Sequence, residues 1–351
     1  MISPGKNIQP WLHSGRFDLP FILLPGFVAL AITLCLPAEY KLTDRSSLAG
    51  WVILVIFIDV AHVYSTLFRT YWDKGRMAKH RTLYIAVPVA CYIAGVLLYS
   101  ADALFFWRIL AYLAVFHFVR QQYGFMRLYA RHEQKEGLAA KIDAVTIYAA
   151  TLYPLIYWHF TPQRNFTWFV EGDFILSNSA VVKQIALAIY LLIIATYVLK
   201  EIVVATTQKK INIPKNILIA VTLVSWYFGI VWYNGDMAFT LLNVVAHGIP
   251  YMALVWLMRR KEVNSITSNS KRTFRHTLVF FVLSILLFAY LEEGLWDGLV
   301  WREHQQVFTA FTWLPTMRTK EALALLVPLL SLPQSTHYVL DGFIWKKEKA
   351  V

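Results

Sequence analysis

Apolar runs of about twenty residues, separated by short polar breaks, repeat along the chain. A helix needs about 20 residues to cross the roughly 30 Å hydrocarbon core of a membrane, so each run predicts one spanning helix. The sequence before the first run, WLHSGRFDLP, lacks a small-residue cleavage pattern, so we expect a retained helix rather than a signal peptide. We predict about ten spans, at 19–37, 49–68, 82–100, 102–126, 142–160, 181–204, 214–233, 237–258, 276–295 and 321–345.

The composition supports this interpretation. The chain has 351 residues, of which 58% are hydrophobic, 16% aromatic and only 15% charged, which is too apolar for a soluble protein of this length. The pattern contains no internal repeat, low-complexity tract or separate soluble domain. We therefore expect an all-α, polytopic membrane helical bundle, with residues 1–351 as a single transmembrane domain.

The basic residues indicate topology. A net charge of +12 could suggest nucleic-acid binding, but the Lys and Arg residues gather after the even-numbered runs. Examples are Arg69, Lys74, Arg127, Arg131, Lys200, Lys215, Arg259, Arg260, Lys346 and Lys347. By the positive-inside rule this distribution places both termini in the cytoplasm, and it predicts contact with anionic lipid rather than nucleic acid. The compact loops favour a bacterial inner membrane.

Four of the ten histidines fall deep within predicted spans. His13, His80, His132, His276 and His304 lie in tails or loops, where solvation explains them, and His159 ends a run in an aromatic context as a weak outer-side candidate. The remaining four are His62, His117, His247 and His337. All four lie on even-numbered runs, roughly ten to fifteen residues from the outer end, which is a depth of about 15–22 Å.

Four imidazoles at one depth predict a shared site, because polar groups in the bilayer are costly and usually face a bundle interior or cavity. Asp59 lies three residues before His62 and Asp341 four after His337, so each pair shares a helix face. Each aspartate is a candidate ligand or a partner for the ring N–H that does not face the metal. Gln121 lies four residues after His117, and Asn243 lies four residues before His247, so both are further hydrogen-bonding partners on the same helix face.

The predicted ligand set consists of His62, His117, His247 and His337. Imidazole with carboxylate suits Fe, Zn, Mn or Cu, and such a set with open positions is typical of non-haem iron that activates oxygen. The two cysteines, Cys35 and Cys91, have no metal-like spacing. We therefore expect non-haem iron, with Zn, Mn or Cu as alternatives.

Two further residues are candidates for catalytic roles beside Asp59 and Asp341. Arg120 lies one turn below His117 and either pairs with one of those carboxylates or extends to lipid phosphate. Tyr338 adjoins His337, and Tyr64, Tyr123 and Tyr251 lie within a turn or two of the histidines. Each of these tyrosines either positions or donates to a bound ligand or packs as an aromatic residue.

Other charged residues have simpler explanations. Arg69 and Arg127 come at inner helix ends, where we expect them to reach phosphate. Glu292 and Glu293 close the ninth run on the outer side, where we expect interfacial solvation.

Helix-breaking residues cluster near two of the histidines. Gly248 and Pro250 follow His247, and Pro328 and Pro333 precede His337. Broken helices at membrane depth are tolerated where the backbone lines a protein cavity. We expect such a cavity to have apolar walls and to admit a lipidic substrate.

The arrangement of these motifs resembles the Brp/Blh-type membrane dioxygenases that cleave β-carotene to retinal. The matching pieces are Asp59-Val60-Ala61-His62, His117-Phe118 and His247-Gly248-Ile249-Pro250. They cover about a tenth of the chain, and the early motif lacks the family's P-H-G-A-x-D form, while His337 and Asp341 lie in an added late span. The resemblance implies iron and oxygen chemistry.

The leading interpretation is a membrane-embedded metal oxygenase or oxidase that acts on an isoprenoid or other lipid, with an unidentified electron donor. A haem-binding electron-transfer protein is a second interpretation. A proton-coupled transporter with an Asp/His relay is a third. A lipid acyltransferase built on His247 and Asn243 would leave three histidines unexplained.

Overall fold

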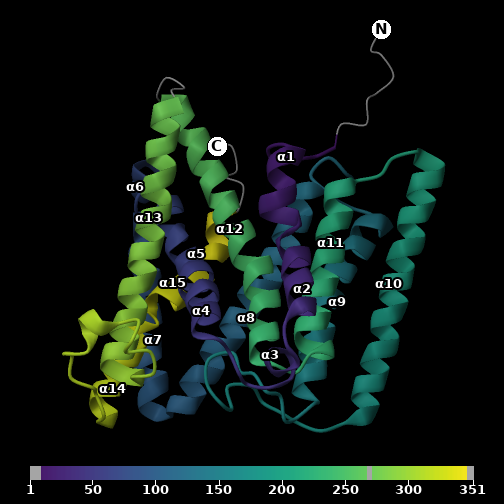
Figure 1. Ribbon diagram of the computed structural model, residues 1–351. Coiled ribbons are helices and arrows are strands. Elements are labelled where there is room, and N and C mark those ends of the chain that lie inside the picture. The colour runs from purple at the N-terminus through teal and green to yellow at the C-terminus, as the bar shows by residue number, and fades with distance from the viewer. Residues whose placement is uncertain (1–8, 267–270, 346–351) are drawn as a thin grey trace. The chain divides into compact units, whose positions relative to one another are not determined.

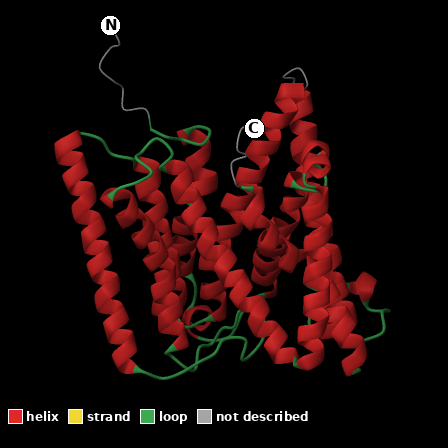
Figure 2. Ribbon diagram, turned by 180° about the vertical axis from the view of Figure 1, so that it is seen from behind, coloured by secondary structure: helices red, strands yellow, loops and turns green. Residues whose placement is uncertain are grey.

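The computed structural model describes residues 9–266 and 271–345, and all regular elements in these ranges are helices. Figure 1 traces the helices in chain order, and Figure 2 shows only helices and loops, with no strand in these two ranges. The predicted all-α fold is therefore confirmed. The basic residues Lys346 and Lys347, which contributed to the topology prediction, and the first eight residues lie outside the described ranges, so the cytoplasmic placement of the termini stays a prediction.

Seven helices in the described ranges are long and apolar enough to cross a membrane, and two bent helix pairs raise the number to as many as nine. The seven cover Leu48–Arg69, Arg81–Ala101, Ala103–Tyr129, Ala180–Gln208, Ile213–Trp232, Asp236–Arg260 and His276–Trp301. The predicted run 142–160 also forms a helix, α9 (Leu138–His159), but this helix is not among the candidates. It carries Lys141, Asp143 and two threonines, which lower its mean hydropathy, so the predicted number of ten spans is not confirmed.

The chain forms two compact units, and the single predicted domain stays a prediction. Unit 1 comprises residues 1–46, 118–167 and 175–250; unit 2 comprises residues 47–117, 168–174 and 251–351. Two continuous helices, α8 (Ala103–Tyr129) and α12 (Asp236–Ile266), each pass from one unit into the other, after His117 and after Pro250.

The elements of unit 1 besides α8, α9 and α12 are α1 (Gly15–Asp18), the π-helical segment η1 (Leu19–Leu23), α2 (Pro25–Cys35), α3 (Ala38–Leu42), α10 (Ala180–Gln208), α11 (Ile213–Trp226) and the π-helical segment η4 (Tyr227–Trp232). The first bent pair turns by 48° between η1 and α2. Pro25 begins α2 there, because proline supplies no backbone N–H for a continuing helix.

The elements of unit 2 begin with α4 (Leu48–Trp51), the π-helical segment η2 (Val52–Val60), α5 (Ala61–Ser65), the 3-10 segment η3 (Thr66–Arg69), α6 (Lys74–Lys79) and α7 (Arg81–Ala101). They continue with α13 (Lys271–Trp296), η5 (Asp297–Trp301), η6 (Thr309–Phe311), α14 (Lys320–Leu330) and α15 (Leu332–Ile344). The last two form the second bent pair, which turns by 43° at Ser331. Gly95 of α7 permits close packing here, since a Cβ at this position would lie 2.9 Å from Pro328.

A buried ionic network ties α9, α10 and α11 together in unit 1. Lys215 Nζ lies 3.0 Å from Asp143 Oδ2, 3.0 Å from Glu133 Oε2 and 3.2 Å from Glu201 Oε1. Lys200 also pairs with Asp143 and Glu201. Lys215 and Asp143 are 3% and 2% exposed, so these lysines bind carboxylates inside the protein, whereas the charge pattern alone had assigned them to lipid contact.

We expect Lys215→Met to lower the free energy of unfolding by about 3–5 kcal/mol, because it removes the shared cation and leaves buried carboxylates with one lysine fewer. Denaturant or thermal unfolding in detergent measures this. Lys210→Met, at an exposed position, is the matched control. Equal stability of the two variants would contradict a structural role for the network.

Candidate metal centre

Four histidines from four helices form one group in the structure. His62 lies on α5, His117 on α8, His247 on α12 and His337 on α15, and each is at most 2% exposed. One nitrogen from each ring can be chosen so that all four atoms lie within 4.8 Å of one another. The histidines that the sequence placed at one depth therefore come together, and they could bind a metal ion. Their depth in a bilayer stays a prediction.

The distance between the two closest rings suits ligands of a single ion. His117 Nε2 and His337 Nε2 are 3.1 Å apart. Two nitrogens that each lie about 2.1 Å from a metal, at an angle between 90° and the tetrahedral value, are about 3.0–3.4 Å apart. The ring of His62 is centred 5.1 Å from that of His337 and 6.4 Å from that of His117.

Asp341 fixes which nitrogen of His117 faces the group. Its Oδ2 lies 3.3 Å from His117 Nδ1, while its Oδ1 accepts hydrogen bonds from Tyr251 Oη at 3.0 Å and from the indole of Trp345. Because an ionised carboxylate only accepts, this contact favours the His117 tautomer that carries its proton on Nδ1. The Nε2 lone pair is then available as a ligand, the arrangement common to metal-binding histidines.

Thr66 does the same for His337 through a chain of hydroxyls. Thr66 Oγ1 lies 2.7 Å from His337 Nδ1 and 3.1 Å from Tyr251 Oη. The only hydroxyl proton of Tyr251 is donated to Asp341, so Thr66 donates to Tyr251 and accepts from His337 Nδ1–H. The Nε2 atoms of the two rings lie 3.1 Å apart, within hydrogen-bond distance of each other. With the Nδ1 protons directed to Asp341 and Thr66, both Nε2 lone pairs could bind one cation.

Asp59 and Asp341 occupy different surroundings. Asp341 is buried, whereas the Asp59 side chain is 38% exposed and its Oδ1 lies 3.5 Å from His62 Nδ1. Asp59 belongs to the π-helical segment η2, a form that occurs frequently at functional sites. The structure places both aspartates beside histidine Nδ1 atoms, but Asp341 faces His117 on another helix rather than His337 on its own.

His247 is held by its backbone and by stacking. Its ring lies 3.5 Å from that of Phe118 at an interplanar angle of 5°, and its carbonyl accepts from Gln121 Nε2 at 2.9 Å. The Asn243 amide donates to Phe239 O of its own helix. The sequence predicted Gln121 and Asn243 as hydrogen-bonding partners of His117 and His247, but Gln121 bonds to the backbone of His247 and Asn243 to the backbone of Phe239.

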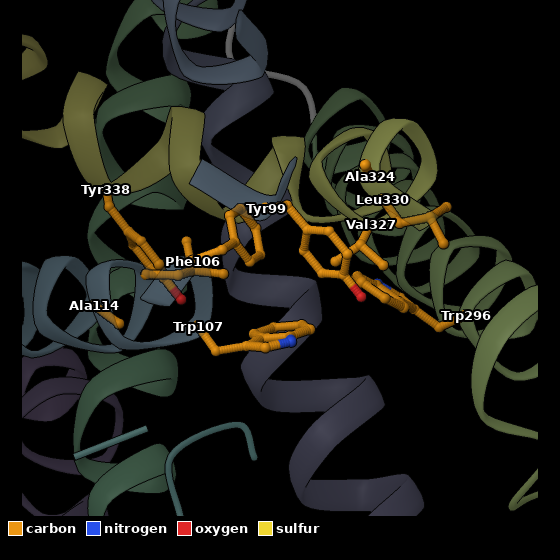
Figure 3. Close-up of a cluster of buried hydrophobic side chains, with 10 residues drawn as sticks. Tyr99, Phe106, Trp107, Ala114, Trp296, Ala324, Val327, Leu330 and Tyr338 are labelled. Atoms are coloured by element: carbon orange, nitrogen blue, oxygen red, sulfur yellow. The ribbon is translucent and has the colours of Figure 1, made fainter. Parts of the chain in front are cut away.

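Tyr338 joins the histidine group to an aromatic cluster in unit 2. Its ring is centred 5.2 Å from His117 and 5.6 Å from His337. Figure 3 shows Tyr338 at one edge of this cluster, which also contains Tyr99, Phe106, Trp107 and Trp296. Packing on the two imidazoles is therefore its observed contact.

Arg120 contacts two tyrosines. It is exposed, its Nη1 donates to Tyr148 Oη at 2.6 Å, and its guanidinium lies over the ring of Tyr123. The expected pairing of Arg120 with Asp341 or Asp59 stays a prediction. Arg69 also differs from expectation, since it is buried over the ring of Trp345, the residue that donates to Asp341.

Glu292, like Thr66, is a residue whose role beside the histidine group the sequence did not reveal. It is 4% exposed, and its carboxylate accepts from Tyr64 Oη at 2.5 Å and from Gln334 Nε2. The expected interfacial solvation is therefore wrong for this residue, because α13 places it against α5 and α15. The available signal was the position of Tyr64 and Gln334 within three residues of His62 and His337.

No family model, curated protein or solved structure matches the chain. The resemblance to the Brp/Blh-type dioxygenases therefore stays a prediction. The chemistry of the side chains is the basis on which a function can be proposed.

We expect Asp341→Asn to weaken metal binding by about 10–100-fold, the usual effect of removing the partner of a ligating histidine. The asparagine side chain keeps the shape of the aspartate but loses its charge. Its NH₂ group cannot accept a hydrogen bond, so it cannot replace both carboxylate oxygens, one of which faces His117 while the other accepts from Tyr251 and Trp345. Competition titration with Co²⁺ or Zn²⁺ measures the dissociation constant. Glu321→Gln, at an exposed position, is the control, and equal affinities would show that Asp341 does not orient a ligand.

Proposed function

We propose that this chain is a membrane-embedded, non-haem metal oxygenase or oxidase that holds iron on the histidine group and acts on an isoprenoid or other lipidic substrate. The observation that carries the proposal is the pair of facing Nε2 atoms of His117 and His337, each fixed by a partner at Nδ1. Two imidazole nitrogens at this separation are spaced as neighbouring ligands of one cation.

The donor set favours iron among the candidate metals. All four candidate ligands are imidazoles, and neither Cys35 nor Cys91 belongs to the group. Imidazole with carboxylate at hand, and without thiolate, is the chemistry of non-haem iron and of related Zn, Mn and Cu sites. Asp59, as the more exposed of the two aspartates, supplies a carboxylate at the edge of the group.

Bound iron would supply the activation of O₂, while the chain positions the ligands and excludes water. Asp341 and Thr66 hold the protons at Nδ1 of His117 and His337, so that neither ring turns its N–H toward the metal position. Tyr338 and its aromatic cluster cover one side of the two imidazoles with apolar rings. Helices apolar enough to lie in a membrane support a lipidic substrate, since such a molecule reaches this site from the bilayer.

The geometry opposes the haem alternative. Two axial nitrogens on opposite sides of one haem iron are separated by about 4 Å, twice a metal–nitrogen bond. The 3.1 Å between His117 Nε2 and His337 Nε2 suits neighbouring positions on an ion with no porphyrin between them.

A proton-coupled carrier is the second candidate. The chain from His337 through Thr66 and Tyr251 to Asp341 and His117 is a continuous series of proton donors and acceptors, as a membrane proton relay requires. It differs from the oxygenase in needing no metal.

We expect the detergent-purified protein to contain about one iron per chain by mass spectrometry and to lack a Soret band. The double variant His117→Ala/His337→Ala should lose the metal, because it removes the two best-oriented ligands. The exposed pair His132→Ala/His276→Ala should retain it. Oxygen consumption with isoprenoids and other lipids then tests the reaction.

Other outcomes separate the alternatives. A strong Soret band would establish haem, and a folded, active transporter without metal would establish the carrier. Iron binding without oxygen consumption on any lipid would retain the metal site and exclude the oxygenase.

A further inference from the structure

A single buried carboxylate links the two segments that carry His62 and His337. Glu292 of α13 accepts from Tyr64 through Oε2 and from Gln334 through Oε1. Tyr64 lies two residues after His62, and Gln334 lies three residues, or nearly one helical turn, before His337. All of these residues belong to unit 2.

Both histidine-bearing segments lie at irregular places in their helices. α5 is the part of the helix Leu48–Arg69 between the π-helical segment η2 and the 3-10 segment η3. α15 begins directly after the 43° bend at Ser331, and Gln334 lies in its first turn. The position of each imidazole therefore depends on side-chain contacts with neighbouring helices.

Glu292 provides such contacts from α13, which also packs against Tyr64 through Phe288, at a ring distance of 5.4 Å. The rings of His62 and His337, centred 5.1 Å apart, lie on the two segments that this carboxylate joins. Glu292 also hydrogen-bonds to Trp296 of its own helix, but its bonds to Tyr64 and Gln334 join the two segments that carry His62 and His337.

We propose that Glu292 is a positioning residue of the metal site. It sets the separation of His62 and His337 through Tyr64 and Gln334, without touching the metal. This inference rests on the proposed metal binding by the histidine group.

The test measures Co²⁺ affinity and the Co²⁺ d–d absorption spectrum, which reports ligand geometry. Glu292→Leu should weaken binding about 10–100-fold and change the spectrum. Tyr64→Phe and Gln334→Met should each produce a smaller change in the same direction. In the Glu292→Leu background, Tyr64→Phe should add nothing, because the interaction it removes is already absent.

Tyr290→Phe is the matched control, since it removes a tyrosine hydroxyl from α13 that bonds to Val307 O. Near-ultraviolet circular dichroism checks folding, and the two single-bond variants serve if Glu292→Leu does not fold. Wild-type affinity and spectrum in these folded variants, or additive effects of Glu292→Leu and Tyr64→Phe, would overturn the role of Glu292 alone. No Co²⁺ binding by the wild-type protein would overturn the metal site as well.

Discussion

Pairing of polar groups buried among apolar helices is the constraint on which the rest of this structure depends. An unpaired polar group in such surroundings costs several kcal/mol, so each buried imidazole or carboxylate needs a partner on another element. Asp341 meets this need by accepting from Tyr251 and Trp345 while it faces His117. The same contacts that satisfy the carboxylate also fix the orientation of a ring, so stability and site geometry have one cause.

Irregular helices place these partners. The π-helical segment η2 precedes His62, and the bend at Ser331 precedes His337. A regular helix repeats its side-chain directions every 3.6 residues, whereas a break or a widened turn changes which residues face a neighbour. Thr66, in the short 3-10 segment η3, can thereby bond to His337 and Tyr251 together.

Buried charged groups in unit 1 also have partners on other elements, but there the partners are side chains of opposite charge. Lys200 and Lys215 are surrounded by Asp143, Glu133 and Glu201, so cations and carboxylates compensate one another within the protein. The part of unit 2 that contains His62, His117 and His337 has imidazoles, hydroxyls and carboxylates beside the buried guanidinium of Arg69. The imidazole nitrogens that face one another there could bind a cation supplied from outside the chain.

The sequence by itself determined the all-helical class, most of the apolar spans and the four histidines that meet, because twenty-residue hydropathy and helical depth are properties of consecutive residues. It also marked Asp59, Asp341 and Tyr338, which lie one turn or less from a histidine. Only the tertiary structure decided that Asp341 serves His117, that Thr66 serves His337, that Glu292 is buried and that Arg120 turns to Tyr148. These are contacts between elements far apart in the chain, and which face of each helix meets which neighbour is set by bends, π-helical turns and side-chain packing that no local pattern encodes.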